Sequence, residues 1–190
     1  MMKEAIRNIL ILAAIIITAL PCAAYSQNLV ENAGFEQMGT NNLPEGWKVN
    51  IARNTEAEVT LDENEKHGGN RSLKIHVDPP GGRVVVYIDE SISGPVTPGI
   101  THEATVWVKT ENIDFNRFTQ APAIRVNYRP QRVRPGGIID LIAKTKGLSD
   151  WIELKTEIPP ALTNSRRIHV DIIMTKGTLW IDDLEVKAVE

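Results

Sequence analysis

The sequence predicts an all-β protein that folds as a β-sandwich, a jelly roll of about nine strands. From residue 27 onward no apolar pattern keeps the helical period, whereas short runs rich in β-branched residues recur along the chain. Clusters of Gly, Pro, Asn and Asp separate these runs, as turns separate strands. About nine strands in a domain without a disulfide are accommodated by two packed sheets.

The strands are expected in regular succession, each ended by a turn sequence. One segment, 138–146, fits either a short strand or a single helical turn. We predict strands at 47–51, 57–61, 71–77, 83–92, 102–110, 121–129, 151–158, 166–174 and 178–187, with turns at 79–82, 98–99, 135–137, 159–160 and 176–177.

Alternation along three of these runs separates a core face from an outer face. In 83–92 the even-numbered residues from 84 to 88 are apolar, while Arg83, Tyr87 and Asp89 share the opposite face. In 121–129 Arg125 and Asn127 point away from the apolar face. The expected core residues of these runs are Val84, Val86, Ile88, Ile92, Ile124, Val126, Tyr128, Ile168, Val170, Ile172 and Met174.

The first 26 residues are expected to be a secretory signal peptide rather than part of the fold. Lys3 and Arg7 precede the apolar run 9–20, and small residues follow it up to Ser26. That run is too short for a membrane span, which takes about 20 apolar residues. Cleavage after Ser26 leaves a single domain of residues 27–190, and cleavage after Ala24 is the alternative. The protein is therefore expected to be secreted or periplasmic.

Charge and cysteine content narrow the function further. The full chain has a net charge of −3, and the mature domain would carry −4 because residues 1–26 contain Lys3, Arg7 and Glu4. No excess of positive charge points to nucleic acid or to an anionic membrane surface. The single cysteine, Cys22, lies in the predicted leader, so the mature domain has no disulfide and relies on its core or on a metal.

The last predicted strand carries two adjacent carboxylates, Asp182 and Asp183, between large apolar residues. Because side chains alternate across a strand, both cannot point outward unless the strand bulges. A buried carboxylate requires a cation or several hydrogen-bond donors, and calcium is the cation expected with oxygen ligands. The alternative is a strand end at which both aspartates reach water.

Six fragments, none specific by itself, together resemble the bacterial carbohydrate-binding modules of families four, nine and twenty-two. The resemblance spans almost all of 28–187 and implies a calcium-stabilised jelly roll that binds polysaccharide without performing chemistry. The fragments are NLVENAGFE (28–36), LPEGW (43–47), HGGNRSLKI (67–75), PG and VWVK (98–99 and 106–109), DWIEL with IP (150–154 and 158–159), and WIDD (180–183).

The resemblance also implies a ligand set for the structural calcium. The side chains of Glu36 and Asp182 would hold the ion, and Asp183 is the alternative if the strand bulges. Backbone oxygens of the glycine-rich loop, near Glu65, Lys66 and Gly68, would complete the shell. Such a site would fasten the N-terminal segment to the last strand.

The expected sugar site is poor in aromatic rings. Aromatic residues make up 5% of the chain, and the four tryptophans fall at framework positions and are assigned to packing. Tyr87 is the best remaining ring for stacking on a sugar, and it shares a strand face with Arg83 and Asp89. Arg125 and Asn127 can line the same groove from another strand; an ordinary half-exposed tyrosine is the alternative for Tyr87.

Arginines concentrate in the segment 117–134 of an otherwise acidic domain. Because guanidinium groups bind carboxylates through two parallel hydrogen bonds, we hypothesise an acidic polysaccharide, such as a uronic-acid polymer, as the ligand. A solvated loop is the alternative. The arginines are Arg117, Arg125, Arg129, Arg132 and Arg134.

Other functions remain as alternatives. The chain has no Gly-x-Ser-x-Gly motif and no phosphate-binding glycine loop. A jelly-roll polysaccharide lyase or hydrolase is one alternative, and a structural or interaction module that has lost sugar binding is another. A glycan-degrading enzyme encoded elsewhere is a candidate partner of a binding module. The lyase would use Tyr87, Arg125, Asn127 and His169; a metal cluster at His76, Asp78, His169 and Asp171 would require their strands to be neighbours.

Overall fold

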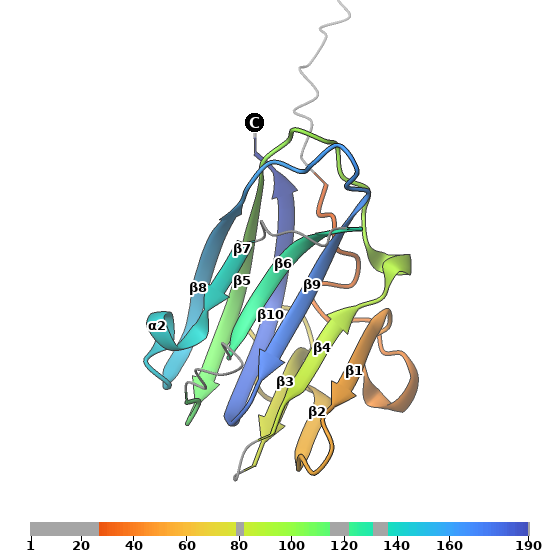
Figure 1. Cartoon of the computed structure of the whole chain (residues 1–190). Helices are drawn as coiled ribbons and strands as arrows, with labels where there is room; N and C mark the ends of the chain where they lie inside the picture. The colour runs from red at the N-terminus through yellow and green to blue at the C-terminus, as the bar shows by residue number, and fades with distance from the viewer. Residues whose placement is uncertain (1–26, 79–81, 115–121, 131–136, 190) are drawn as a thin grey trace, which may run out of the picture.

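Two antiparallel sheets packed face to face form the computed structural model, which describes residues 27–78, 82–114, 122–130 and 137–189 (Figure 1). One sheet has the order β1-β4-β9-β6-β7 and the other β2-β3-β10-β5-β8. The strands are β1 (Trp47–Ile51), β2 (Ala57–Asp62), β3 (Ser72–Val77), β4 (Val84–Ile88), β5 (His102–Glu111), β6 (Ala123–Arg129), β7 (Gly137–Asp140), β8 (Ser149–Ile158), β9 (Arg167–Met174) and β10 (Gly177–Ala188).

The predicted β-sandwich is confirmed, with ten strands in the described residues where about nine were expected. The segment left open as strand or helical turn is both, because β7 ends at Asp140 and a single-turn helix, α2 (Leu141–Thr145), follows it. The predicted strand 83–92 stops at Ile88. Asp89 ends it by accepting a hydrogen bond from the Ser91 amide (2.8 Å), which starts the 3-10 helix η2 (Glu90–Ile92).

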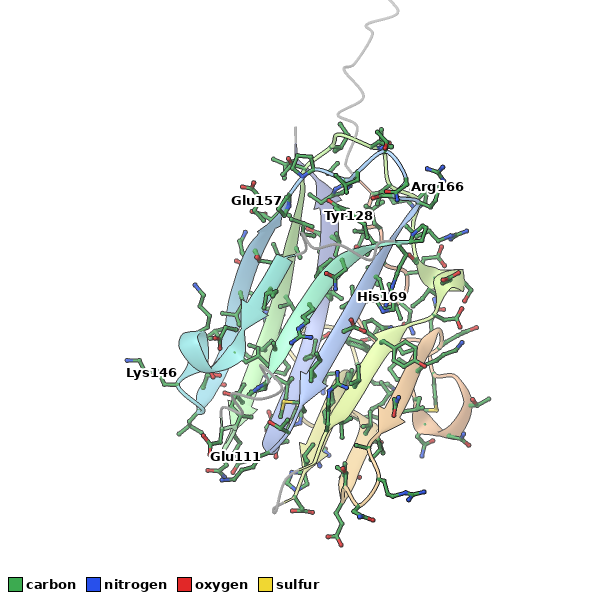
Figure 2. The ribbon with its side chains drawn as sticks, viewed as in Figure 1. Glu111, Tyr128, Lys146, Glu157, Arg166 and His169 are labelled. Carbon is green, nitrogen blue, oxygen red and sulfur yellow. The ribbon has the colours of Figure 1, made fainter. Side chains whose placement is uncertain are left out.

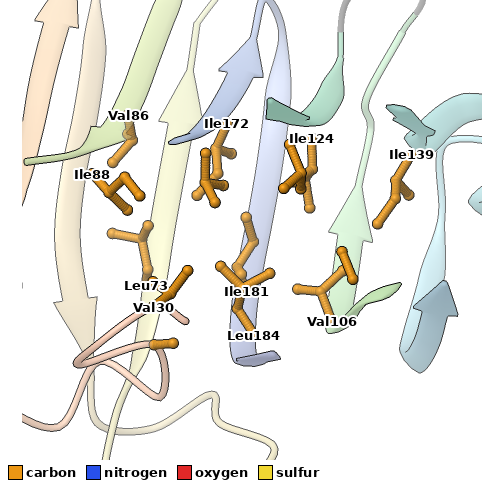
Figure 3. Close-up of a cluster of buried hydrophobic side chains, with 14 of the residues drawn as sticks. Val30, Leu73, Val86, Ile88, Val106, Ile124, Ile139, Ile172, Ile181 and Leu184 are labelled. Atoms are coloured by element: carbon orange, nitrogen blue, oxygen red, sulfur yellow. The ribbon is translucent and has the colours of Figure 1, made fainter. Parts of the chain in front are cut away.

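Apolar side chains from both sheets interdigitate to form one core (Figure 3). The expected alternation is confirmed in β4, where Val84, Val86 and Ile88 are buried and Val85 and Tyr87 are half-buried. Each fully buried aliphatic side chain stabilises the fold by about 1.5–3 kcal/mol. The core residues labelled in Figure 3 are Val30, Leu73, Val86, Ile88, Val106, Ile124, Ile139, Ile172, Ile181 and Leu184.

A buried polar network lies at one end of this core, near the labelled Tyr128 in Figure 2. The Tyr128 hydroxyl donates to the Pro159 carbonyl (2.8 Å), so the Nδ1–H group of His102 is the donor to the phenol oxygen (2.9 Å). Burial lowers the pKa of His102 and raises the pKa of Tyr128 to about 12. Both side chains are therefore neutral near pH 7 and can be accommodated inside the sandwich.

The N-terminal segment is fastened to the middle of the second sheet. The Leu29 amide donates to the Val186 carbonyl (2.8 Å), and the Asn28 side chain bridges Leu184 and Val186. The Leu184 amide donates to the Ala33 carbonyl (3.0 Å). These contacts lie beside an irregularity in β10 between Asp182 and Glu185, so the segment satisfies backbone groups that the strand pairing leaves open.

Several sequence predictions lie outside the described residues. They are the leader 1–26 with Cys22, the turn at 79–81, and three of the five clustered arginines, Arg117, Arg132 and Arg134. Within the described part of the chain, no helix has the length and apolar character needed to span a bilayer.

Candidate functional site

The outer face of the β1-β4-β9-β6-β7 sheet carries the candidate ligand site. Strand pairing places Lys48 of β1 opposite Tyr87 of β4, and Tyr87 opposite Asp171 of β9. Asp171 in turn lies opposite Arg125 of β6, and the next outward pair is His169 and Asn127. One row of outward side chains therefore crosses four neighbouring strands, and Tyr87 supplies its aromatic ring.

Two open hollows on this face share Tyr87, Arg129 and His169 and thus form one continuous groove. Their volumes are about 430 and 290 Å³. His169 lies near the middle of the sheet in Figure 2. The first hollow is also lined by Lys48, Ile88, Asp89 and Glu90, and the second by Asn50, Arg83, Val85 and Asp171.

Tyr87 and His169 form the floor shared by the two hollows, and Asp171, which contacts His169, lines the second hollow. His169 Nε2 lies 3.0 Å from Asp171 Oδ1, and the His169 side chain is only 10% exposed. The Tyr87 ring lies 6.2 Å from the imidazole, centroid to centroid, at an angle of 45°. Tyr87 is half-buried, so one part of its ring packs on the sheet while the rest faces the groove.

An ion pair lies at the edge of the groove, between β1 and the end of β4. Lys48 Nζ pairs with the Asp89 carboxylate, and Asp89 also accepts the Ser91 amide. The Lys48 ammonium group and the Ser91 hydrogen bonds lower the pKa of Asp89 to about 2. Asp89 is therefore ionised at any physiological pH, and its ion pair with Lys48 makes that ammonium group a weaker partner for a negatively charged ligand.

Two arginines of the groove differ from these paired groups. Arg83, just before β4, and Arg129, at the end of β6, are both exposed. Within the described part of the chain neither guanidinium group forms an ion pair. Two exposed guanidinium groups beside one aromatic ring can bind carboxylates while the ring stacks on the apolar face of a sugar.

The predicted ligand residues are brought together in part. Tyr87, Arg83 and Asp89 line the groove. Arg125 and Asn127 lie on the same outer face, on β6 and opposite Asp171 and His169, but they border the two hollows without lining them. Sequence reasoning does not single out Lys48, since only the pairing of β1 with β4 places it beside Tyr87.

The predicted metal residues gather at a second place, around the loop 67–71. Asp182 is 1% exposed and accepts hydrogen bonds from the amides of His67 (2.9 Å), Gly68 (3.0 Å) and Asp183 (2.8 Å). Burial raises the pKa of Asp182, against the effect of these amide donors. Asp183 has φ +45°, which marks the bulge, and its exposed carboxylate meets the His67 ring at 2.8 Å. The expectation that at least one aspartate faces the packed side or sits at a bulge is therefore confirmed: Asp182 is buried, and the strand bulges beside it.

Glu36 binds the other end of the same loop. Its carboxylate accepts hydrogen bonds from the Asn70 amide (2.8 Å), the Arg71 amide (3.2 Å) and Asn70 Nδ2 (3.1 Å). These donors lower the pKa of Glu36, although partial burial opposes them. At Gly69, whose φ is +55°, a Cβ atom would collide with the Glu36 carboxylate, so this close approach requires glycine.

The hydrogen-bond donors around Glu36 and Asp182 determine whether these carboxylates need a calcium ion. Glu36 and Asp182 each already accept three hydrogen bonds, so the buried charge has hydrogen-bond donors without an ion. In the described residues no group of three or more His, Cys, Asp or Glu side chains is placed to hold a metal. A calcium ion at this place would bind the remaining lone pairs of the Glu36 and Asp182 carboxylates. Carbonyl oxygens of the loop, those of Lys66 and Gly68 among them, would complete its shell.

Aromatic rings of the second sheet hold this loop from outside. The His67 imidazole stacks on Trp107 with a centroid distance of 3.7 Å and an angle of 11°, and the Trp151 ring centroid lies 6.0 Å from that of His67.

The other two tryptophans pack elsewhere in the fold. Trp180 donates its indole N–H to Asp62 (2.9 Å) and is 8% exposed. Trp47 is 4% exposed and packs on Phe35. The tryptophans therefore pack against the fold and the loop, as their framework positions suggest.

The hypothetical four-residue metal cluster is wrong. His76 and Asp78 belong to β3 and its end, whereas His169 and Asp171 belong to β9, and these strands lie in different sheets. Each histidine instead pairs with the aspartate two residues further on, at 3.1 Å and 3.0 Å.

Comparison with known proteins identifies relatives in fold only. No protein-family model matches the chain, and no curated protein sequence matches it. TmCBM61 bound to beta-1,4-galactotriose is similar in structure, with a TM-score of 0.56 and 14% identity over 86% of this chain and 100% of that one. The CBM22-1 xylan-binding domain of Paenibacillus barcinonensis Xyn10C has a TM-score of 0.50 and 15% identity, over 87% of this chain and 96% of that one.

A tailspike structure is equally similar. The enzymatically active domain of tailspike protein 4 of bacteriophage CBA120 has a TM-score of 0.56 and 12% identity over 85% of this chain. This chain spans only 21% of that tailspike chain. The shared property is the fold, and two of these three relatives are carbohydrate-binding modules.

Proposed function

We propose that this protein is a secreted, non-catalytic carbohydrate-binding module whose ligand is a polysaccharide that carries carboxylate groups. The groove on the β1-β4-β9-β6-β7 sheet is the proposed site. One observation carries the proposal: Tyr87 lies on the floor of an open groove that is also lined by Arg83 and Arg129, two exposed arginines that have no carboxylate partner in the described residues. The fold shared with sugar-binding modules supports it.

Each part of the groove has a place in this function. The ring of Tyr87 offers an apolar surface for the C–H face of a sugar, and Asn50 offers hydrogen-bonding groups for hydroxyls. Arg83 and Arg129 would bind carboxylates, which fits a uronic-acid polymer better than a neutral glucan. The proposed partner is a glycan-degrading enzyme encoded elsewhere, which would act on the polysaccharide that this module binds.

Affinity gel electrophoresis tests the proposal directly. The purified protein is run through gels containing polygalacturonate, alginate, xylan or a neutral β-glucan, and bovine serum albumin serves as the non-binding reference. We expect retardation by a uronate polymer, with weaker retardation by neutral polymers. Tighter binding to xylan or glucan than to either uronate polymer would contradict the acidic preference, and no retardation in any gel would contradict the binding function.

A lyase is the second candidate, because the structure brings Tyr87 within 6.2 Å of a histidine that is itself paired with Asp171. A tyrosine, a histidine and an arginine around one groove are the groups that β-elimination from a uronate would need. A lyase would convert the polymer to unsaturated uronates, so ultraviolet absorbance would rise during incubation. A binding module leaves the absorbance unchanged.

We also propose that a structural calcium ion binds where Glu36 and Asp182 approach the loop 67–71. The side chains of Glu36 and Asp182 both accept hydrogen bonds from this loop, so two carboxylates and the loop carbonyls are the candidate oxygen ligands. Calcium present at one hundred times its dissociation constant would stabilise the fold by about 2.7 kcal/mol.

Thermal unfolding with added calcium and with a chelator tests this site. We expect the melting temperature of the wild type to fall when the chelator replaces calcium. Glu36→Gln should melt at the same temperature in both conditions. A wild type that melts identically with calcium and with chelator has no such site, and its loop is held by the amide hydrogen bonds alone.

A further inference from the structure

The charges that line the groove cancel when His169 is neutral. The groove has three permanent cations and three carboxylates, so one proton on the imidazole leaves it with a net charge of +1. Histidine is the side chain whose ordinary titration falls between pH 5 and 8. The cations are Lys48, Arg83 and Arg129, and the carboxylates are those of Asp89, Glu90 and Asp171.

His169 contacts Asp171, the carboxylate at the centre of the outer face. Asp171 lies between Tyr87 and Arg125 in the cross-strand row, at the centre of the outer face. A sugar stacked on Tyr87 would place its own carboxylate near Asp171, and two like charges repel. Because His169 Nε2 lies 3.0 Å from Asp171 Oδ1, protonation of the imidazole offsets that repulsion at its source.

We propose that His169 makes the binding of acidic polysaccharides pH-dependent, with tighter binding when the imidazole is protonated. This inference rests on the proposed function of the groove. The charged and titratable groups that face His169 are Asp171 and Arg167 of its own strand, Arg83, Tyr87, Asp89 and Glu90 from β4 and its ends, Arg125 and Arg129 from β6, and Lys48 from β1.

The chain contains a matched control for this histidine. The tetrapeptide Ile-His-Val-Asp occurs at 75–78 and again at 168–171. In both copies the histidine pairs with the aspartate two residues further on, at 3.1 Å for His76 and 3.0 Å for His169. His76 lies on β3, in the other sheet, so its titration leaves the charge of the groove unchanged.

Isothermal titration calorimetry with oligogalacturonate at pH 5.5 and pH 8.0 tests the proposal, and xylohexaose serves as the neutral probe. Sugar carboxylates, like α-carboxyl groups, have a pKa of about 3.5 and are ionised at both pH values. We expect the wild type to bind oligogalacturonate about five times more tightly at pH 5.5, the factor that one unit charge about 4 Å away produces in a water-like medium. His169→Gln should bind equally at both pH values, and His76→Gln should behave like the wild type.

Asp171→Asn provides a second, independent variant, because it removes the repelling carboxylate permanently. It should bind oligogalacturonate at pH 8.0 at least as tightly as the wild type does at pH 5.5. Equal wild-type affinity at the two pH values, or a pH dependence that survives in His169→Gln, would overturn the proposal while leaving the binding function intact. Failure to bind any sugar at either pH, in a protein whose circular dichroism shows it folded, would instead overturn the proposed function.

Discussion

Tyr87→Ala is expected to weaken polysaccharide binding about thirtyfold, a loss of about 2 kcal/mol, which is typical of an aromatic hot spot. Tyr87 supplies the ring of the floor that both hollows share, so its removal takes away the apolar surface on which a sugar would stack. Calorimetry or gel retardation with the tightest-binding polymer of the panel measures the loss.

Tyr87→Phe is the matched control for this substitution. It keeps the ring and removes only the hydroxyl group, so it should retain most of the affinity. The fold should survive both changes, because Tyr87 is half-buried and points outward from β4 rather than into the core. Wild-type affinity in Tyr87→Ala would show that sugars bind elsewhere on the molecule.

Asp182→Ala is expected to destabilise the protein by about 3 kcal/mol and to lower its melting temperature by about 10 °C. The substitution leaves the amides of His67, Gly68 and Asp183 without their acceptor beside a side chain that is 1% exposed. A buried unsatisfied donor costs about 1–3 kcal/mol, and some of these amides will find water. Urea unfolding followed by circular dichroism gives the free energy.

The neighbouring residue offers the control. Asp183 has the same side chain, but it is 46% exposed and contacts the His67 ring only at the surface. Asp183→Asn keeps a residue that tolerates the positive φ of the bulge and should cost less than about 1 kcal/mol. Equal losses in the two variants would show that the loop is not held through the buried carboxylate.

Local patterns predict much of this fold because strand alternation is a property of neighbouring residues. The buried set Val84, Val86 and Ile88 follows from a period of two within one run. The bulge at Asp182 and Asp183 is also a local necessity, since two adjacent carboxylates conflict with that period. The strand β7 is harder to predict, because its four residues run directly into a helical turn.

The groove depends on strand order, which local patterns do not contain. Lys48 and Tyr87 are far apart in the chain and meet because β1 pairs with β4. His169 and Asp171 join them because β9 inserts between β4 and β6. Tyr87, Arg83 and Asp89 could be predicted as a group because all three come from one strand and its ends. Two of the three amide donors to Asp182, those of His67 and Gly68, are likewise nonlocal, since they lie more than a hundred residues earlier.

The two ends of the described chain leave the sandwich together. Leu29 is hydrogen-bonded to Val186, and Val189 to Thr101, so the first and last described segments are neighbours at one end of the molecule (Figure 1). His169, which lines the groove, lies part-way down one face of the sheet (Figure 2). Anything attached beside Leu29 or Val189, whether a surface, a bead or a second protein, is thus held at the same end of the molecule. The sugar-facing flank would stay accessible in each case, so this protein can be immobilised or joined in tandem through its termini without blocking the proposed site.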